Sequence, residues 1–109
     1  MERQQYLFLS GLKLFSGRSE QDSVSISFDD GLLAVFSPVE ISGFETDIKA
    51  AEAVQFLSGC TVLDAYSDQD RLNLDFGGVY LHISLKPEDY LGSHAACWNG
   101  NDGKTFPIK

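Results

Sequence analysis

Apolar residues occupy every second position from Leu72 to Phe76 and again from Val79 to Leu85. With a period of two, every second side chain lies on the same face of a β-strand, so each stretch predicts a strand with one buried face. Gly77-Gly78 separates the two stretches and suits a two-residue hairpin turn. The pattern therefore predicts an antiparallel hairpin, which ends at Pro87 because proline cannot continue the hydrogen-bond ladder.

The first half of the chain repeats this pattern at a distance of 48 residues. Phe8-Leu9-Ser10-Gly11 corresponds to Phe56-Leu57-Ser58-Gly59, and no gap is needed between residues 7–40 and residues 55–88. The alternating apolar positions of the predicted strands coincide as well. Self-similarity at a fixed period of this size is typical of tandem structural units.

Residues 47–57 are rich in helix-forming amino acids and predict a helix at the start of the second unit. Asp47 suits the N-terminal cap, and Gly59 stands where a helix commonly ends. By the repeat, residues 2–9 should form a shorter helix. Taken alone, residues 6–9 are equally compatible with a strand.

Each unit is thus predicted to contain a helix followed by three strands in helix-β-β-β order. We expect pseudo-repeats over about residues 2–43 and 47–91, and a β-hairpin in an extension over residues 92–109. A three-stranded sheet of this size is marginal by itself, so the units should pack together about a pseudo-two-fold axis. The prediction is a single α+β domain over residues 1–109 with antiparallel meanders. Whether the strands form one sheet or two stays open.

The chain has 109 residues and a net charge of −8, with 16 acidic residues against 8 basic ones. A surface of this sign repels nucleic acid and anionic membranes and favours basic partners, although acidity also serves simply to keep a protein soluble. No apolar run approaches the ~20 residues that span a bilayer, and the first residues lack a signal-peptide pattern. We therefore predict a cytoplasmic protein that binds neither nucleic acid nor membrane.

Residues that could carry catalysis or bind a metal do not form a recognisable motif. Ser93 and His94 are adjacent, and neighbours along a strand point apart, so they are no nucleophile–base pair. His94 and Cys97 are three residues apart, but a zinc site needs three or four ligands, and His82 belongs to another strand. The carboxylates cluster in solvated turns, where nothing raises their pKa. We predict no enzymatic activity, no metal and no cofactor.

The segment over residues 86–98 is the most distinctive, because it breaks the repeat. It brings Tyr90 and Trp98 together with the acidic residues Glu88 and Asp89. Aromatic and charged residues together are typical of protein-binding hot spots. The alternative is that both aromatic side chains cap the open end of a sheet.

This segment also carries a family resemblance. A strand followed by Pro87-Glu88-Asp89-Tyr90-Leu91-Gly92 resembles a pattern in small bacterial proteins associated with polymorphic toxin systems, many of which are described as immunity proteins. The resemblance covers roughly residues 24–35 and 72–96, and the chain departs from it at Ser93-His94, where the group has Pro-Glu. It implies a protein that binds and neutralises a cognate toxin without catalysis.

The leading hypothesis is therefore an immunity-type binding protein whose acidic surface covers a basic toxin, such as a nuclease. The candidate contact residues are acidic or aromatic and belong to the second unit and its extension: Asp64, Asp68, Asp70, Asp75, Glu88, Asp89, Tyr90 and Trp98. Two alternatives stay open. One is a structural module that self-associates as a homodimer through an open sheet edge. The other is a small-ligand-binding or enzymatic domain with a pocket between the units.

Overall fold

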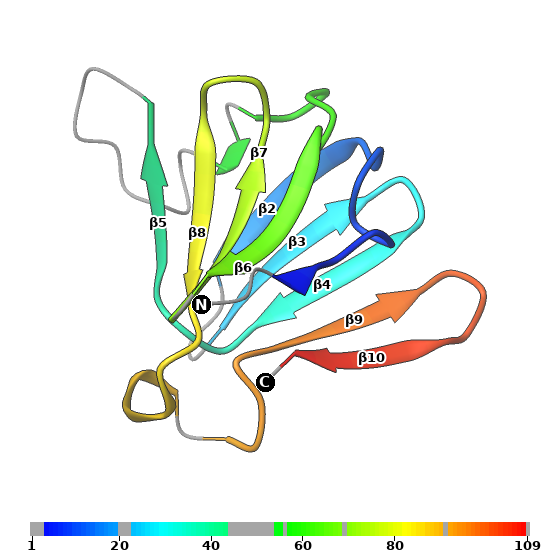
Figure 1. The fold of residues 1–109 in the computed structure, drawn as a ribbon. Helices are drawn as coiled ribbons and strands as arrows, with labels where there is room; N and C mark the ends of the chain where they lie inside the picture. Colours follow the sequence, from blue (N-terminus) through cyan, green and yellow to red (C-terminus); the bar gives the residue numbers. More distant parts are fainter. Residues whose placement is uncertain are drawn as a thin grey trace.

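The computed structural model describes residues 4–19, 23–43, 54–55, 57–68, 70–90 and 92–108 (Figure 1). Nearly all of the regular secondary structure in these residues belongs to two antiparallel β-sheets. Sheet I has the strand order β1-β6-β7-β8-β5, and sheet II has the order β10-β9-β4-β3-β2. A short 3-10 turn, η1 (Pro87–Asp89), follows β8. The strands are β1 (Gln4–Gln5), β2 (Leu14–Ser19), β3 (Val24–Phe28), β4 (Gly31–Val35), β5 (Val39–Ser42), β6 (Asp64–Asp68), β7 (Arg71–Asp75), β8 (Tyr80–Ser84), β9 (Ala96–Gly100) and β10 (Thr105–Ile108).

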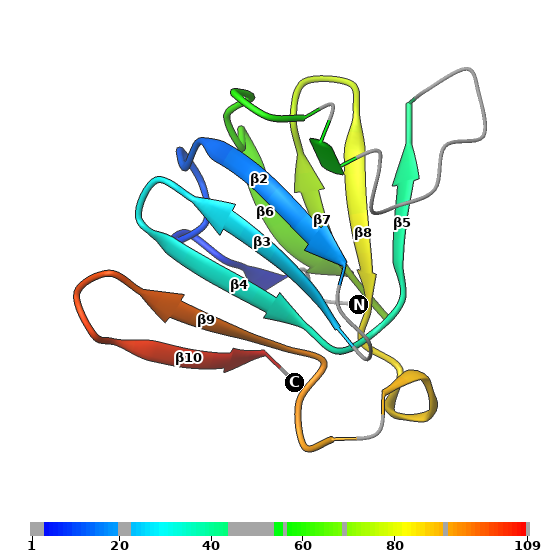
Figure 2. The same ribbon diagram turned by 180° about the vertical axis from the view of Figure 1, so that it is seen from behind.

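Each half of the chain builds a three-strand meander and then sends its next strand into the opposite sheet. The meander β2-β3-β4 lies in sheet II, and the meander β6-β7-β8 lies in sheet I. The next strand of the first half, β5, pairs with β8, whereas β9 leaves the second half and pairs with β4. Figures 1 and 2 show both crossings at the same end of the molecule. Separating the two halves would therefore break both ladders.

Residues 48 positions apart make reciprocal backbone hydrogen bonds where the two halves meet. The Gly11 N–H donates to the Val62 carbonyl at 2.7 Å, and the Gly59 N–H donates to the Leu14 carbonyl at 2.7 Å. Both glycines have a left-handed φ, of 87° and 88°, which other residues adopt only with strain. This reciprocity is that of an approximate two-fold axis between the halves.

The inward-facing side chains of both sheets meet in one apolar core. Burial alternates along β4 and β8, as expected for strands with one face in the core. An aromatic cluster closes the core beside β9, where the ring centroid of Phe8 lies 5.9 Å from that of Trp98 and 5.2 Å from that of Phe106. Fully buried members of the core include Leu14, Ile26, Leu33, Leu72, Leu74, Leu81 and Ile83.

The predicted α+β class is wrong, because nearly all of the regular secondary structure in the described residues is β-strand. Residues 2 and 3 of the helix predicted over residues 2–9 lie outside the described residues. In place of a helix over the rest, β1 pairs with β6, the Tyr6 N–H donates to the Ala65 carbonyl at 2.8 Å, and residues 7–11 turn. A helix of eight residues is marginal by itself, whereas pairing with β6 satisfies these backbone groups. Most of the helix predicted over residues 47–57 lies outside the described residues. Within its described part, Val54 and Gln55 are helical and Leu57 lies in a turn.

Both predicted β-hairpins are present in the structure. The hairpin predicted over residues 72–85 is present as β7 and β8, and the C-terminal hairpin is present as β9 and β10. The sequence pattern predicts no strand after Pro38, yet β5 forms there. The local pattern misses it because its partner, β8, is far away in the sequence.

The helical residues that the structure describes belong to no segment long and apolar enough to cross a membrane.

The close approach of β4 and β9 can be tested by substituting Gly31, the first residue of β4. A Cβ atom on Gly31 would lie 2.5 Å from the Asn99 carbonyl oxygen and 2.7 Å from the Trp98 indole ring. We expect Gly31→Ala to lower the free energy of unfolding by about 1–3 kcal/mol, the range of an overpacked core, as measured by urea denaturation. Gly92→Ala is the control, because nothing lies within 4 Å of its added Cβ. Equal stabilities of the two variants would contradict this packing.

Candidate functional site

A row of polar side chains crosses the outer face of sheet I. Because Leu72, Leu74, Leu81 and Ile83 face the core, the residues between them face outward. Strand register then aligns one outward residue from each of four neighbouring strands in a single row: Tyr66, Asn73, His82 and Glu40.

His82 lies at the centre of a hydrogen-bonded network in this row. Its Nδ1 lies 2.6 Å from the Asn73 Oδ1, and its Nε2 lies 2.8 Å from the Ser42 hydroxyl. An amide oxygen only accepts, so with this placement Nδ1 carries the proton and Nε2 accepts from Ser42. The Tyr80 ring stacks on the imidazole with a centroid distance of 6.0 Å. The arrangement holds a neutral imidazole with both nitrogens bonded.

The surroundings of His82 also favour its neutral form. Burial lowers the pKa of His82 below its ordinary value of 6.5, and the Arg71 guanidinium lowers this pKa further. The carboxylates of Glu40 and Asp68 act in the opposite direction. Asn73, only 2% exposed, has no hydrogen-bond partner for its Nδ2 among the described residues. The His82 imidazole is thus held neutral beside the buried Asn73 amide, with both of its nitrogens already hydrogen-bonded to other side chains of this face.

Carboxylates oppose each other at one end of the face. Asp64 of β6 and Asp75 of β7 are direct cross-strand partners. Like charges in this position destabilise a sheet. One oxygen of Asp75 accepts a hydrogen bond from the Gly77 N–H at 2.8 Å, which supports the β7–β8 turn. The Asp64–Asp75 pair therefore concentrates negative charge at the surface.

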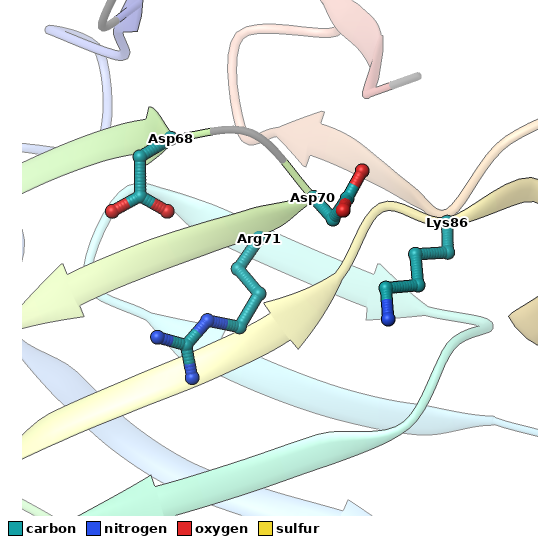
Figure 3. A pocket seen from close by; sticks show the side chains of 4 residues that line it. All are labelled: Asp68, Asp70, Arg71 and Lys86. Atoms are coloured by element: carbon teal, nitrogen blue, oxygen red, sulfur yellow. The ribbon is translucent and has the colours of Figure 1, made fainter.

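The other end of the face is hollowed by two partly open depressions. The larger, of about 420 Å³, is lined by Pro38, Glu40, Arg71, His82, Ser84, Lys86 and Asp89. The smaller, of about 360 Å³, is lined by Asp68, Asp70, Arg71 and Lys86 (Figure 3). Arg71 and Lys86 line both depressions, and their side chains run in the same direction in Figure 3, whereas the Asp70 carboxylate points the other way.

The eight predicted contact residues do not form one surface. Of the acidic ones, Asp64, Asp68 and Asp75 belong to the strands of sheet I, and Asp70 lies in the turn between β6 and β7. The remaining two acidic residues lie in η1, where the Asp89 Oδ2 accepts a hydrogen bond from the Ser84 hydroxyl at 2.5 Å. The acidic residues thus gather around sheet I, with Glu88 beside Asp89.

The predicted aromatic contact residues lie elsewhere. Trp98 is 4% exposed and faces the core from β9, where its ring lies 6.0 Å from that of Phe28. Tyr90 is half-buried and packs against the core. The Trp98 side chain points into the core because directly paired residues share a face of the sheet, and its ladder partner is the buried Leu33. The structure therefore does not bring Trp98 to the surface with the carboxylates.

Sequence reasoning missed Arg71, Lys86, Ser84 and Glu40 as residues of this face. The alternation in β7 and β8 already places Arg71 and Ser84 outward, next to each other in the ladder. Glu40 had no such signal, because β5 reaches sheet I only by the exchange of strands.

The residues considered as metal ligands lie on different parts of the molecule. His82 is on the outer face of sheet I, whereas Cys97 belongs to β9 of sheet II. His94 is exposed in the connection before β9. Within the described ranges, no three histidine, cysteine, aspartate or glutamate side chains come together as a metal site.

The outer face of sheet II has a different chemistry. Arg18 is its charged residue, and no carboxylate belongs to this face among the residues that the structure describes. The other outward-facing residues of its strands are small, polar or apolar: Ser16, Ser25, Ser27, Leu32, Ala34, Cys97, Asn99, Thr105 and Pro107. The negative charge of the described strands is thus placed on one sheet.

Comparison of the chain with models of protein families, with curated proteins and with solved structures finds no match. The resemblance to immunity proteins stays a prediction. Information on function therefore comes from the surface chemistry of the two sheets.

The charges around His82 are tested by its titration. We expect Arg71→Gln to raise the pKa of His82, because the variant removes the cation that disfavours the imidazolium. Glu40→Gln should lower this pKa, because it removes a stabilising carboxylate. Both shifts can be followed by NMR of the imidazole Cε1–H group between pH 4 and 9. Lys104→Gln, an equal charge change in the β9–β10 turn, should leave the His82 titration in place.

The same lowered pKa predicts how stability depends on pH. Between the folded-state pKa and the ordinary value of 6.5, the unfolded chain binds more protons at this histidine than the folded protein does. The contribution of His82 to stability is therefore complete above pH 6.5 and declines as the pH falls toward the folded-state pKa. Urea denaturation of wild type and His82→Gln should show a smaller decline in the variant over this window. An equal decline would contradict the assignment.

Proposed function

We propose that the protein is a non-catalytic binding protein that presents the outer face of sheet I to a basic region of another protein. The observation that carries this proposal is the unequal charge of the two outer faces. Four carboxylates occupy outward strand positions of sheet I, while the described outward strand positions of sheet II hold none and its acidic residues lie in turns. A purely solubilising charge would not need to favour the outward strand positions of one sheet.

The Asp64–Asp75 pair supports this proposal. Two carboxylates held opposite each other repel, and a lysine or arginine from a partner would relieve the repulsion. Half-buried tyrosines at positions 66 and 80 flank the carboxylates and offer the amphipathic contact area that is enriched at interfaces. A rigid sheet also holds its charges in a fixed pattern, which favours fast, electrostatically steered association.

Neutralisation of a toxin is the form of this function that the sequence resemblance favours. A nuclease, for example, carries a basic active site that attracts phosphate, and an acidic sheet face would cover it. No catalytic group is needed for this role, and the hydrogen-bonded, neutral His82 fits a surface that binds without chemistry.

The proposal is tested with the products of the genes adjacent to this one in its genome. We expect one of them to arrest growth when expressed alone, and co-expression of this protein to restore growth. Calorimetry should show a complex at low salt that weakens as salt is added, because the charges are screened. Absence of any complex at low salt would rule the proposal out.

The face itself is tested by removing the opposed carboxylates. Asp64→Asn with Asp75→Asn should raise the Kd for that toxin by about 2- to 30-fold, from about 0.2–1 kcal/mol for each exposed charge pair. The control, Asp30→Asn with Asp102→Asn, makes the same charge change in the turns after β3 and β9. Equal losses in both double variants would mean that net charge, and not this face, determines binding.

A further inference from the structure

Arg71 and Lys86 are the exception on an otherwise acidic face. The chain has only 8 basic residues against 16 acidic ones, yet these two line the same pair of depressions. No carboxylate of the described residues forms an ion pair with either of them, although Asp68 is the direct ladder partner of Arg71. Their donors are therefore open to a ligand.

The surroundings of the two cations restrict what that ligand is. Carboxylates of Glu40, Asp68, Asp70 and Asp89 line the same depressions. A free phosphate dianion would meet them at short range and be repelled. A carboxylate flanked by positive charge fits better, because its anionic group meets Arg71 and Lys86 while the flanking cations meet the rim.

We propose that the depressions lined jointly by Arg71 and Lys86 bind an acidic side chain that stands within the basic surface of the partner protein. This inference rests on the proposed function and specifies the charge pattern of its partner. The Arg71 guanidinium suits a planar carboxylate, to which it donates two parallel hydrogen bonds, and the Lys86 ammonium supplies a second charge.

Such a site gives the face specificity as well as affinity. A uniformly basic surface would place a lysine or arginine against Arg71 and Lys86, and this like-charge contact is unfavourable. A basic surface that carries an acid at this point avoids the repulsion and gains the hydrogen bonds. The two cations thus select among basic partners and fix the register in which one docks.

Two synthetic peptides test the inference without knowledge of the natural partner. Both are acetylated, amidated nonapeptides with four lysines on each side of a central residue, which is glycine in one and aspartate in the other. Electrostatic attraction to a uniformly acidic face would make the aspartate peptide the weaker ligand, because it carries less positive charge. We expect the opposite on wild type, a Kd for the aspartate peptide about two- to fivefold lower, the range of an exposed charge pair.

The measurement is an NMR titration at low ionic strength, followed through the backbone amides of sheet I. In Arg71→Gln with Lys86→Gln, the preference should reverse in favour of the glycine peptide. Arg18→Gln with Lys104→Gln is the matched control, which removes one arginine and one lysine from sheet II and its β9–β10 turn. This control should keep the preference for the aspartate peptide.

The remaining outcomes separate the two proposals. If the glycine peptide shifts the amides of sheet I and the aspartate peptide binds no more tightly, the inference is overturned and the proposed function stands. A preference for aspartate that survives loss of Arg71 and Lys86 also overturns it. If neither peptide perturbs this face, the proposed function fails and the inference fails with it.

Discussion

The fold depends on backbone pairing between strands that come from different halves of the chain. β5 completes sheet I by pairing with β8, and β9 extends sheet II by pairing with β4. Without pairing between the halves, the meanders β2-β3-β4 and β6-β7-β8 would be three-stranded sheets, each too small to hold a core of its own. The exchange therefore makes the two halves one cooperative unit, and it explains why side chains from both sheets share a single core.

The candidate site inherits this constraint. Ser42 and Glu40 lie on β5, while Asn73 and His82 lie on β7 and β8 of the other half. The bond between Ser42 and His82 joins residues 40 positions apart in the sequence, and it exists only because β5 has crossed over. Loss of β5 pairing would expose the side of β8 and remove both the Ser42 bond and the Glu40 charge from His82.

The parts of the structure that follow from local pattern were predictable. Alternation alone identifies the β7–β8 hairpin and turns His82 and Asn73 outward. The N-terminal segment was not predictable, because the helix assigned to it came from similarity to residues 47–57, while its real partner, β6, is remote. Trp98 shows the same limit. The aromatic and charged residues of its segment suggested a surface hot spot. The orientation of Trp98, however, depends on the pairing of β9 with β4, which the local sequence does not encode. The grouping of Arg71 with Lys86, by contrast, follows from the predictable β7–β8 hairpin, whose register places Arg71 opposite Ser84, two residues before Lys86.

The reciprocal hydrogen bonds of Gly11 and Gly59 relate positions in the β6-β7-β8 meander of sheet I to equivalent positions, 48 residues earlier, in the β2-β3-β4 meander of sheet II. Asn73 and His82 are ladder partners on one sheet, and the positions 48 residues earlier, Ser25 and Ala34, are ladder partners on the other. The same arrangement of backbone positions thus occurs twice with different side chains, which form a polar hydrogen-bonded network on sheet I and small side chains on sheet II. A duplicated scaffold of this kind lets one face specialise while its twin preserves the frame, because outward side chains on either sheet change without altering the ladders beneath them.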